Sequence, residues 1–260
     1  MFPTLFHFAG IRVATYGVLV AAGYLAGILW LHSHRDDMGM GEDEFWNVIY
    51  ALFFGAIAGG KILYWIVEWR AFVSGELHPI RDFRYGFVFF GGFLGSVLAG
   101  ILVRRRSASP FWRPADYFGV ALPMGHSIGR LGCLAAGCCI GRPTDLPWGV
   151  RFTAPDSLVP DALRGVPLHP AQLYESAANA LIAWGVWQVV KRVKAGALPH
   201  GSAFLAYAAA YSIARFAIEF VRGDLVRGAA AGLSTSQWIA LATLAGAALA
   251  WRKLPRGKRA

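Results

Sequence analysis

Residues Tyr211–Asp224, YSIARFAIEFVRGD, place several charged side chains in a segment that is otherwise apolar. Three of them, together with Tyr211, fall at i, i+4, i+8 and i+11 of a helix and so share one face: Tyr211, Arg215, Glu219 and Arg222. A charged group near the centre of a bilayer costs several kcal/mol, so it faces the protein interior and has a partner there. The stretch therefore predicts a membrane helix with one functional face.

The composition indicates that the rest of the chain is also built for a membrane. Hydrophobic residues make up 56% of the 260 positions, and the mean hydropathy is +0.46. Apolar runs of roughly 20 residues, enough to cross a hydrocarbon core of about 30 Å, occur at seven places: Val13–Leu31, Phe45–Val67, Phe87–Val103, Ala115–Ile140, Leu173–Val190, Ala203–Val221 and Thr235–Trp251. We expect an all-α polytopic membrane protein with about seven transmembrane helices.

The fourth of these segments is the least lipid-like. Proline, glycine and two ionisable residues interrupt it: Pro123, Gly125, His126, Gly129, Arg130 and Gly132. Polar or irregular backbone at membrane depth is tolerated only where protein or a wet cavity surrounds it. We therefore expect this segment at the centre of the bundle.

The distribution of basic residues predicts the orientation. With seven spans, the first, third and fifth loops and the C-terminus carry thirteen Lys and Arg residues, whereas the opposite side carries nine that are more widely spread. By the positive-inside rule the C-terminus is cytoplasmic and the N-terminus is outside. The net charge of +10 suits basic loops against anionic lipid and does not require nucleic-acid binding. The first ten residues lack a basic region and a cleavage site, so no removable signal peptide is expected.

The chain is expected to form a single bundle over residues 1–260. Its one long insertion, at about residues 142–170, is rich in proline and is expected on the outer face, where the run WGVRFTA favours a small pair of strands. The basic tail at about residues 252–260 is expected to be disordered and cytoplasmic.

The segment HPAQLYES gathers four polar residues where this insertion meets the next span: His169, Gln172, Tyr174 and Glu175. One interpretation is a helix N-terminus with Pro170 at its first position and an interfacial tyrosine. The other is a substrate-binding segment.

The segment GHSIGRLGCLAAGCCIG, residues 125–141, contains Arg130 among small residues. Close helix packing explains the glycines but leaves the arginine without a partner. Because arginine binds carboxylate or phosphate in bidentate geometry, lipid phosphate is the abundant candidate.

The same segment contains three cysteines within seven residues, Cys133, Cys138 and Cys139. We expect these to be small buried packing residues on a helix, since no pair has C-x-x-C spacing and a disulfide at i, i+5 does not fit one helical turn. No metal site is predicted. His126, Lys61 and Tyr16 each allow a structural interpretation: a buried histidine, a snorkelling lysine and an interfacial tyrosine.

Taken together, these segments resemble the prolipoprotein diacylglyceryl transferase family over nearly the whole chain. The resemblance is carried, in order, by Tyr16-Gly17, GAIAGGKILYW, FFGGFLG, GRLGCLAAGCCIGRPT, PWGVRF, HPAQLYE, YSIARFAIEFVRGD and GLSTSQ. HPAQLYE and the Y-x-x-x-R-F-x-x-E-x-x-R pattern are the most specific of these.

The chain also departs from the pattern of that family. In the family's signature G-R-x-G-N-F-x-N-x-E the two asparagines and the glutamate are replaced here by Cys133, Ala136 and Cys138. Phe90 stands where the family has the histidine of H-G-G, and Lys61 where it has an arginine. The chain is identified as a divergent member.

The resemblance implies transfer of a diacylglyceryl group from phosphatidylglycerol to the lipobox cysteine thiol of exported prolipoproteins in the bacterial inner membrane, with glycerol phosphate released and no cofactor required. It assigns four residues to catalysis: Arg130, Arg215, Glu219 and Tyr211. The substrate-binding residues it implies are Arg130, Arg215, Tyr16, Lys61, His169, Gln172, Tyr174, Glu175 and Arg222.

Within that expectation, Arg130 and Arg215 stabilise the leaving phosphate, while Glu219 orients Arg215. The thiol must lose its proton, and the base is open between His126, His169 and the leaving phosphate. Two alternative functions also stay open: a related lipid transferase with another acceptor, and a phospholipid-binding envelope protein without catalysis.

Overall fold

The computed structural model describes residues 2–8, 11–78, 80–83, 86–105, 110–223 and 229–254. Within them the protein is predominantly helical, with nine α-helices, a short 3-10 helix and two two-stranded antiparallel sheets. Contacts divide the chain into a main unit, residues 1–34 and 112–260, and an inserted unit, residues 35–111. The helical fold class is confirmed, and the small sheets are an addition to it.

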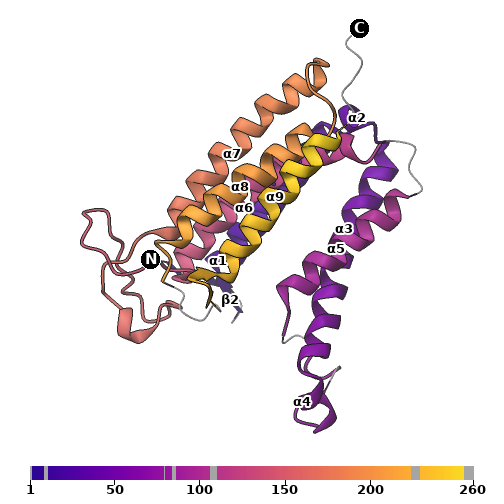
Figure 1. Ribbon diagram of the computed structural model, residues 1–260. Helices are drawn as coiled ribbons and strands as arrows, with labels where there is room; N and C mark the ends of the chain where they lie inside the picture. Colours follow the sequence, from indigo (N-terminus) through magenta and orange to yellow (C-terminus); the bar gives the residue numbers. More distant parts are fainter. Residues whose placement is uncertain are drawn as a thin grey trace. The chain divides into compact units, whose positions relative to one another are not determined.

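The main unit is a helical bundle arranged around one polar helix. Its long helices are α1 (Thr15–Ser33), α6 (Trp112–Ala136), α7 (Ala171–Lys194), α8 (Ser202–Glu219) and α9 (Thr235–Lys253). Helix α6 packs against α1, α7 and α8, and α8 also packs against α7 and α9, so these helices run side by side in Figure 1. The expected central position of α6 is therefore confirmed within this unit.

A buried carboxylate fixes the start of α8. Asp116 of α6 is 1% exposed and accepts hydrogen bonds from the backbone N–H groups of Gly201 and Ala203, both at 2.8 Å, and of Phe204 at 3.1 Å. These are N–H groups that the first turn of a helix leaves without helical partners. A side chain from another helix thus supplies the cap that the N-terminus of α8 lacks locally.

The insertion at residues 142–170 is held together by its own apolar cluster. Ile140, Phe152, Val159 and Leu168 are buried against one another. Apart from the 3-10 helix η1 (Asp161–Leu163), its regular structure consists of isolated bridges, one of which joins Val150 to Leu168. The strand pair expected from WGVRFTA is therefore wrong, because the prolines interrupt the backbone N–H groups that a ladder needs.

The first residues of the chain form a hairpin that contacts this insertion. Strands β1 (Thr4–Phe8) and β2 (Ile11–Ala14) pair antiparallel. Asp156 of the insertion accepts hydrogen bonds from the Oγ1 of Thr4 at 2.9 Å and from the guanidinium of Arg12 at 2.7 Å. The helix α1 consequently begins two residues later than the apolar run predicts.

The last helix is capped at its start and extends beyond its expected end. A second short hairpin, β3 (Ala229–Ala230) and β4 (Leu233–Ser234), leads into α9, where Ser234 and Gln237 form a reciprocal capping box. Helix α9 continues to Lys253, and Leu254 is buried. The expected disordered tail from residue 252 is therefore wrong for residues 252–254, and residues 255–260 lie outside the described residues.

The inserted unit is built on two helices that pack through glycine. It comprises α2 (Arg35–Met38), α3 (Glu42–Val67), α4 (Trp69–Val73) and α5 (Phe89–Arg104). Gly55 and Gly59 of α3 face Gly91 and Gly95 of α5, and a β-carbon at Gly55 would lie only 2.6 Å from the carbonyl oxygen of Gly95. Small residues of this kind let helix backbones approach closely in membranes.

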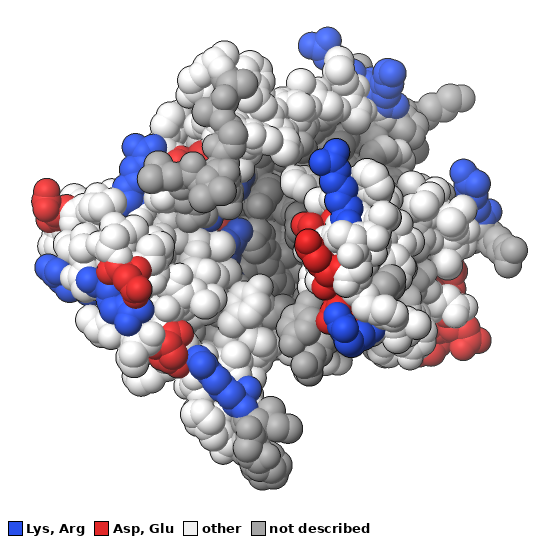
Figure 2. Space-filling view, turned by 90° about the horizontal axis from the view of Figure 1, so that it is seen from below, with Lys and Arg blue, Asp and Glu red and all other residues white. Residues whose placement is uncertain are grey.

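All seven predicted apolar segments are helical, but the number of membrane spans stays a prediction. In the part of the chain that the structure describes, two helices, α1 and α3, are long and apolar enough to cross a bilayer by length and composition, and α5 is a shorter apolar helix. Their outer surfaces carry large exposed apolar side chains, such as Tyr24 and Leu29 of α1 and Phe54 and Ile66 of α3. On the face drawn in Figure 2, uncharged residues predominate and charged side chains form small separate groups.

The close approach of α3 and α5 gives a prediction for stability. Gly55→Ala should lower the free energy of unfolding by about 1–3 kcal/mol, because the added methyl group overpacks the interface. Gly246→Ala on α9 is the control, because no atom of another element lies within 4 Å of the added β-carbon. The better helix propensity of alanine should raise the free energy of unfolding of this variant by up to about 1 kcal/mol. Denaturation of both variants in detergent micelles measures the difference, and equal effects would contradict the glycine-mediated packing.

Candidate functional site

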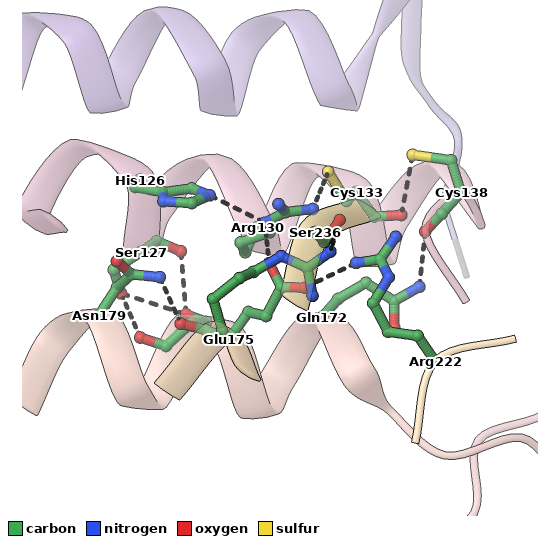
Figure 3. A network of polar contacts seen from close by, with 12 residues as sticks. His126, Ser127, Arg130, Cys133, Cys138, Gln172, Glu175, Asn179, Arg222 and Ser236 are labelled. Carbon is green, nitrogen blue, oxygen red and sulfur yellow. Dashed lines mark hydrogen bonds and ion pairs between the residues drawn. The ribbon is translucent and has the colours of Figure 1, made fainter. Parts of the chain in front are cut away.

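The charged residues of the sequence meet in the interior of the main unit. Helix α6 contributes His126 and Arg130, α7 contributes Glu175, α8 contributes Arg215 and Glu219, and Arg222 lies in the segment that follows α8. Figure 3 shows Arg130, Glu175 and Arg222 pointing toward one another between the helices. The predicted intramembrane charges are therefore neighbours in space.

One carboxylate is shared between two arginines. Oε2 of Glu175 lies 2.6 Å from Nε of Arg130, and Oε1 lies 2.6 Å from Nη1 of Arg222. The side chains of Glu175 and Arg222 are each 3% exposed, whereas that of Arg130 is 17% exposed. Two guanidinium groups and one carboxylate leave this buried triad with one net positive charge.

A second ion pair lies on α8. Nη1 of Arg215 is 2.5 Å from Oε2 of Glu219, one helical turn further on, and Nη2 donates to Oγ of Ser236 at 3.2 Å. The two side chains are 11% and 9% exposed. Glu219 therefore fixes the position of Arg215, as the i, i+4 spacing predicts.

The imidazole of His126 is already engaged by the triad. Nε of Arg130 donates to Nε2 of His126 at 3.0 Å, and the ring of His126 lies 5.7 Å from that of Tyr211. The guanidinium group of arginine has hydrogen-bond donors but no acceptor. Nε2 of His126 must therefore accept this hydrogen bond with its lone pair. That nitrogen is not free to serve as a base in this arrangement.

The polar residues of HPAQLYE separate into two groups. Gln172 is fully buried, and its Nε2 donates to the carbonyl oxygen of Cys138 at 2.7 Å. Tyr174 lies nearer the surface, where its hydroxyl accepts from Nε1 of Trp148 at 2.7 Å and lies 3.4 Å from Nδ1 of His169. The motif thus joins the interior of the bundle to the insertion.

Two further predicted site residues lie on other elements. Tyr16 is in the first turn of α1 and is 44% exposed, and its backbone packs on Gly132 of α6. Lys61 belongs to the inserted unit, where its Nζ donates to the carbonyl oxygens of Phe83 and Gly86. Asp224, which ends the charged stretch, lies outside the described residues.

Sequence reasoning missed a polar face of α7. Asn179 is buried and donates to the carbonyl oxygen of Glu175 at 2.7 Å, and Ser176 exchanges side-chain-to-backbone hydrogen bonds of 2.9 Å with Ser127 of α6. With Gln172 and Glu175, these residues repeat at three- and four-residue intervals. That spacing is the signal that could have revealed the face.

Cys133 is a buried residue of α6, as the sequence suggested, but Cys138 and Cys139 lie beyond the end of the helix. Helix α6 ends at Ala136, and the chain turns back through Gly137 and Cys139, which have φ angles of 78° and 57°. The three Sγ atoms of Cys133, Cys138 and Cys139 consequently lie within 4.8 Å of one another. The expected helical position was wrong for Cys138 and Cys139, because the apolar run was continued as a helix to Ile140, whereas a role in packing stays a prediction.

The fold and site define a helical membrane protein built around a buried arginine–carboxylate network. A family model for prolipoprotein diacylglyceryl transferase matches residues 3–252. A phosphatidylglycerol–prolipoprotein diacylglyceryl transferase of Clostridium tetani is 34% identical over 94% of both chains. Enzymes with that name from Clostridium perfringens and Geobacter sulfurreducens are 34% and 32% identical, over 92% and 85% of this chain and 90% and 82% of theirs.

This chain belongs to the prolipoprotein diacylglyceryl transferase family. The resemblance drawn from HPAQLYE and YSIARFAIEFVRGD is thereby confirmed, and the protein is a transferase of lipoprotein biosynthesis. These comparisons assign no function to its individual site residues.

The shared carboxylate gives a prediction for folding. Glu175→Gln should lower the free energy of unfolding by about 3–5 kcal/mol, because it removes the buried carboxylate that both guanidinium groups share. Asp161→Asn is the control: its side chain is 92% exposed and pairs with Arg164, so its loss should cost well under about 1 kcal/mol. Denaturation in micelles compares the two, and equal stabilities would show that Glu175 does not hold the arginines together.

Proposed function

We propose that this protein transfers the diacylglyceryl group of phosphatidylglycerol to the lipobox cysteine of a prolipoprotein signal peptide. The acceptor sulfur, as a thiolate, forms a bond to the terminal glyceryl carbon. The bond between that carbon and the phosphate oxygen breaks, and glycerol phosphate leaves with its electron pair. The products are a thioether and a phosphate monoester, and no redox change occurs.

The net positive charge of the Arg130–Glu175–Arg222 triad is the observation that supports this proposal best. Two guanidinium groups around one carboxylate make this part of the interior attractive to an anion. The phosphodiester of phosphatidylglycerol carries one negative charge, which would balance the charge of the triad. Because the leaving phosphate gains a second charge as the carbon–oxygen bond breaks, the same cations would stabilise the transition state more than the bound lipid.

The different exposures of the arginines suggest different roles for them. Arg222 is nearly inaccessible, so we assign it to holding Glu175. Arg130 is more open, and we propose that its terminal nitrogens bind the phosphate while its Nε faces Glu175 and His126. Arg215, held by Glu219 and Ser236, is proposed as the second phosphate ligand, and Tyr211 is proposed to line the same site.

The remaining predicted residues are proposed to guide the substrates. Tyr174 and His169, with Trp148, form an aromatic group at the insertion that suits the interfacial part of a signal peptide. Gln172 holds the turn that carries Cys138. Tyr16 and Lys61 keep their assignment to substrate binding as a proposal.

Lysine substitutions test the phosphate ligands. Arg130→Lys and Arg215→Lys should each slow transfer by about a hundredfold or more, because an ammonium group keeps the charge but loses the planar donor fork. The measurement is the rate at which a labelled diacylglyceryl group moves from phosphatidylglycerol to a lipobox peptide, normalised to folded protein. The control is Arg164→Lys, a surface arginine paired with Asp161. A rate near that of the control in either variant would rule out the shared-phosphate arrangement.

We also propose that the protein lies in the bacterial inner membrane as a single seven-span bundle, with residues 142–170 outside and the C-terminus cytoplasmic. The asymmetry of the basic residues supports this orientation. Reporter fusions after Pro160 and at the C-terminus should report opposite sides of the membrane. If both report the same side, an even number of spans follows residue 160, which would contradict the three that the seven-span bundle places there.

A further inference from the structure

The three cysteine thiols form a compact cluster next to the charged network. Cys133 lies on α6, and Cys138 and Cys139 lie in the turn that follows it. All three Sγ atoms are within 4.8 Å of one another. These are all the cysteines of the chain, and Figure 3 shows Cys133 and Cys138 beside Arg130 and Gln172.

The backbone of the turn is held in the conformation that gathers the thiols. The carbonyl oxygen of Cys138 accepts the hydrogen bond of the buried Gln172 at 2.7 Å. Gly137 cannot carry a side chain, because its β-carbon would collide with Ser157. Cys139 occupies the left-handed region at φ 57°, which is uncommon for a residue with a side chain. The arrangement is therefore fixed by tertiary contacts.

We propose that Cys133, Cys138 and Cys139 bind one zinc-class cation through three thiolates, and that its fourth position takes the thiol of the acceptor cysteine. The second part rests on the proposed function. Catalytic zinc sites have three protein ligands and one open position, and the cluster supplies three. The cation would thus serve as the activator of the nucleophile.

The geometry and charge of the cluster suit such an ion. A tetrahedral zinc ion about 2.3 Å from each sulfur holds its thiolates about 3.8 Å apart, so the sulfurs need to move by about 1 Å at most. Nη1 of Arg130 lies 4.0 Å from Sγ of Cys133, so a cation sits beside a site whose three thiolates would give the bound ion a net negative charge. Soft thiolate ligands favour zinc over magnesium or calcium.

This assignment supplies a means of activating the acceptor thiol. The family's histidine of H-G-G is replaced by Phe90, and Nε2 of His126 is occupied by Arg130. A thiol that coordinates a metal ion is deprotonated. The acceptor thiol would release its proton to water and attack the glyceryl carbon as a thiolate, while the oxidation state of the metal stays unchanged.

A covalent role for these cysteines fits the chemistry less well. If one of them attacked the lipid itself, it would form a thioether, and a neutral thioether sulfur bound to an alkyl carbon is a poor leaving group. A second thiol could not then displace it readily. The cluster therefore suits activation of the acceptor rather than storage of the diacylglyceryl group.

Metal content is the first test. The full-length enzyme, purified in detergent without chelator, should contain about one zinc ion per chain by elemental analysis. The variant with Cys133→Ser, Cys138→Ser and Cys139→Ser should lose at least nine-tenths of it. Ser127→Ala, which removes a small polar group elsewhere on α6, should retain it. Circular dichroism and gel filtration show whether the variants are folded.

Thiol protection in the unaltered protein provides a test that does not depend on the folding of a variant. In the zinc-loaded enzyme all three cysteines should react slowly with a small maleimide, and a chelator should expose all three. Equal reactivity with and without zinc, or a stable disulfide between two of the cysteines, would overturn the site.

Cobalt substitution tests the fourth position. The cobalt-loaded enzyme should show sulfur-to-cobalt charge-transfer absorption that increases when a lipobox peptide is added, whereas the same peptide with serine in place of cysteine should leave it unchanged. An identical response to both peptides would overturn the activation step.

The metal site and the transferase activity can be refuted separately. Full-rate diacylglyceryl transfer by metal-free enzyme would refute the metal step and support the transferase. Zinc binding and a cysteine-specific spectral change without any transfer would refute the proposed function and leave the metal site intact.

Discussion

The pairing of Glu175 with both Arg130 and Arg222 determines how the centre of this protein is organised. It joins α6, α7 and the segment after α8 through two contacts of 2.6 Å in a nearly water-free environment. Each ion is costly to bury alone, and the three together still carry a positive charge. The network therefore holds the helices in register and at the same time creates a site for an anion.

The parts of the structure that follow periodicity could be predicted from the sequence. Each of the seven apolar runs is a helix, and α6, with Pro123, Gly125 and Arg130, is central in the main unit. The spacing of Arg215 and Glu219 also gave their ion pair, because residues four apart meet on any helix. Local geometry decides all of these features, so local sequence is enough.

Other features depend on contacts between distant segments, and the sequence alone did not predict them. Glu175 was expected among the substrate-binding residues, but its two partners come from 45 residues before it and 47 after it. Asp116 caps a helix 85 residues further along. The cysteines converge because α6 ends at Ala136 and the following turn includes positive φ angles. Periodicity gave no sign of that turn.

The most direct test is the distance between the phosphorus of bound phosphatidylglycerol and the arginine side chains. Solid-state NMR on protein with ¹⁵N-labelled arginine, bound to this lipid, measures phosphorus–nitrogen dipolar coupling. The account predicts a separation of about 4 Å, the value for a guanidinium hydrogen-bonded to phosphate, and loss of that coupling when Arg130→Lys and Arg215→Lys are combined. Coupling that persists in the double variant would show that other arginines bind the lipid phosphate and would contradict the account.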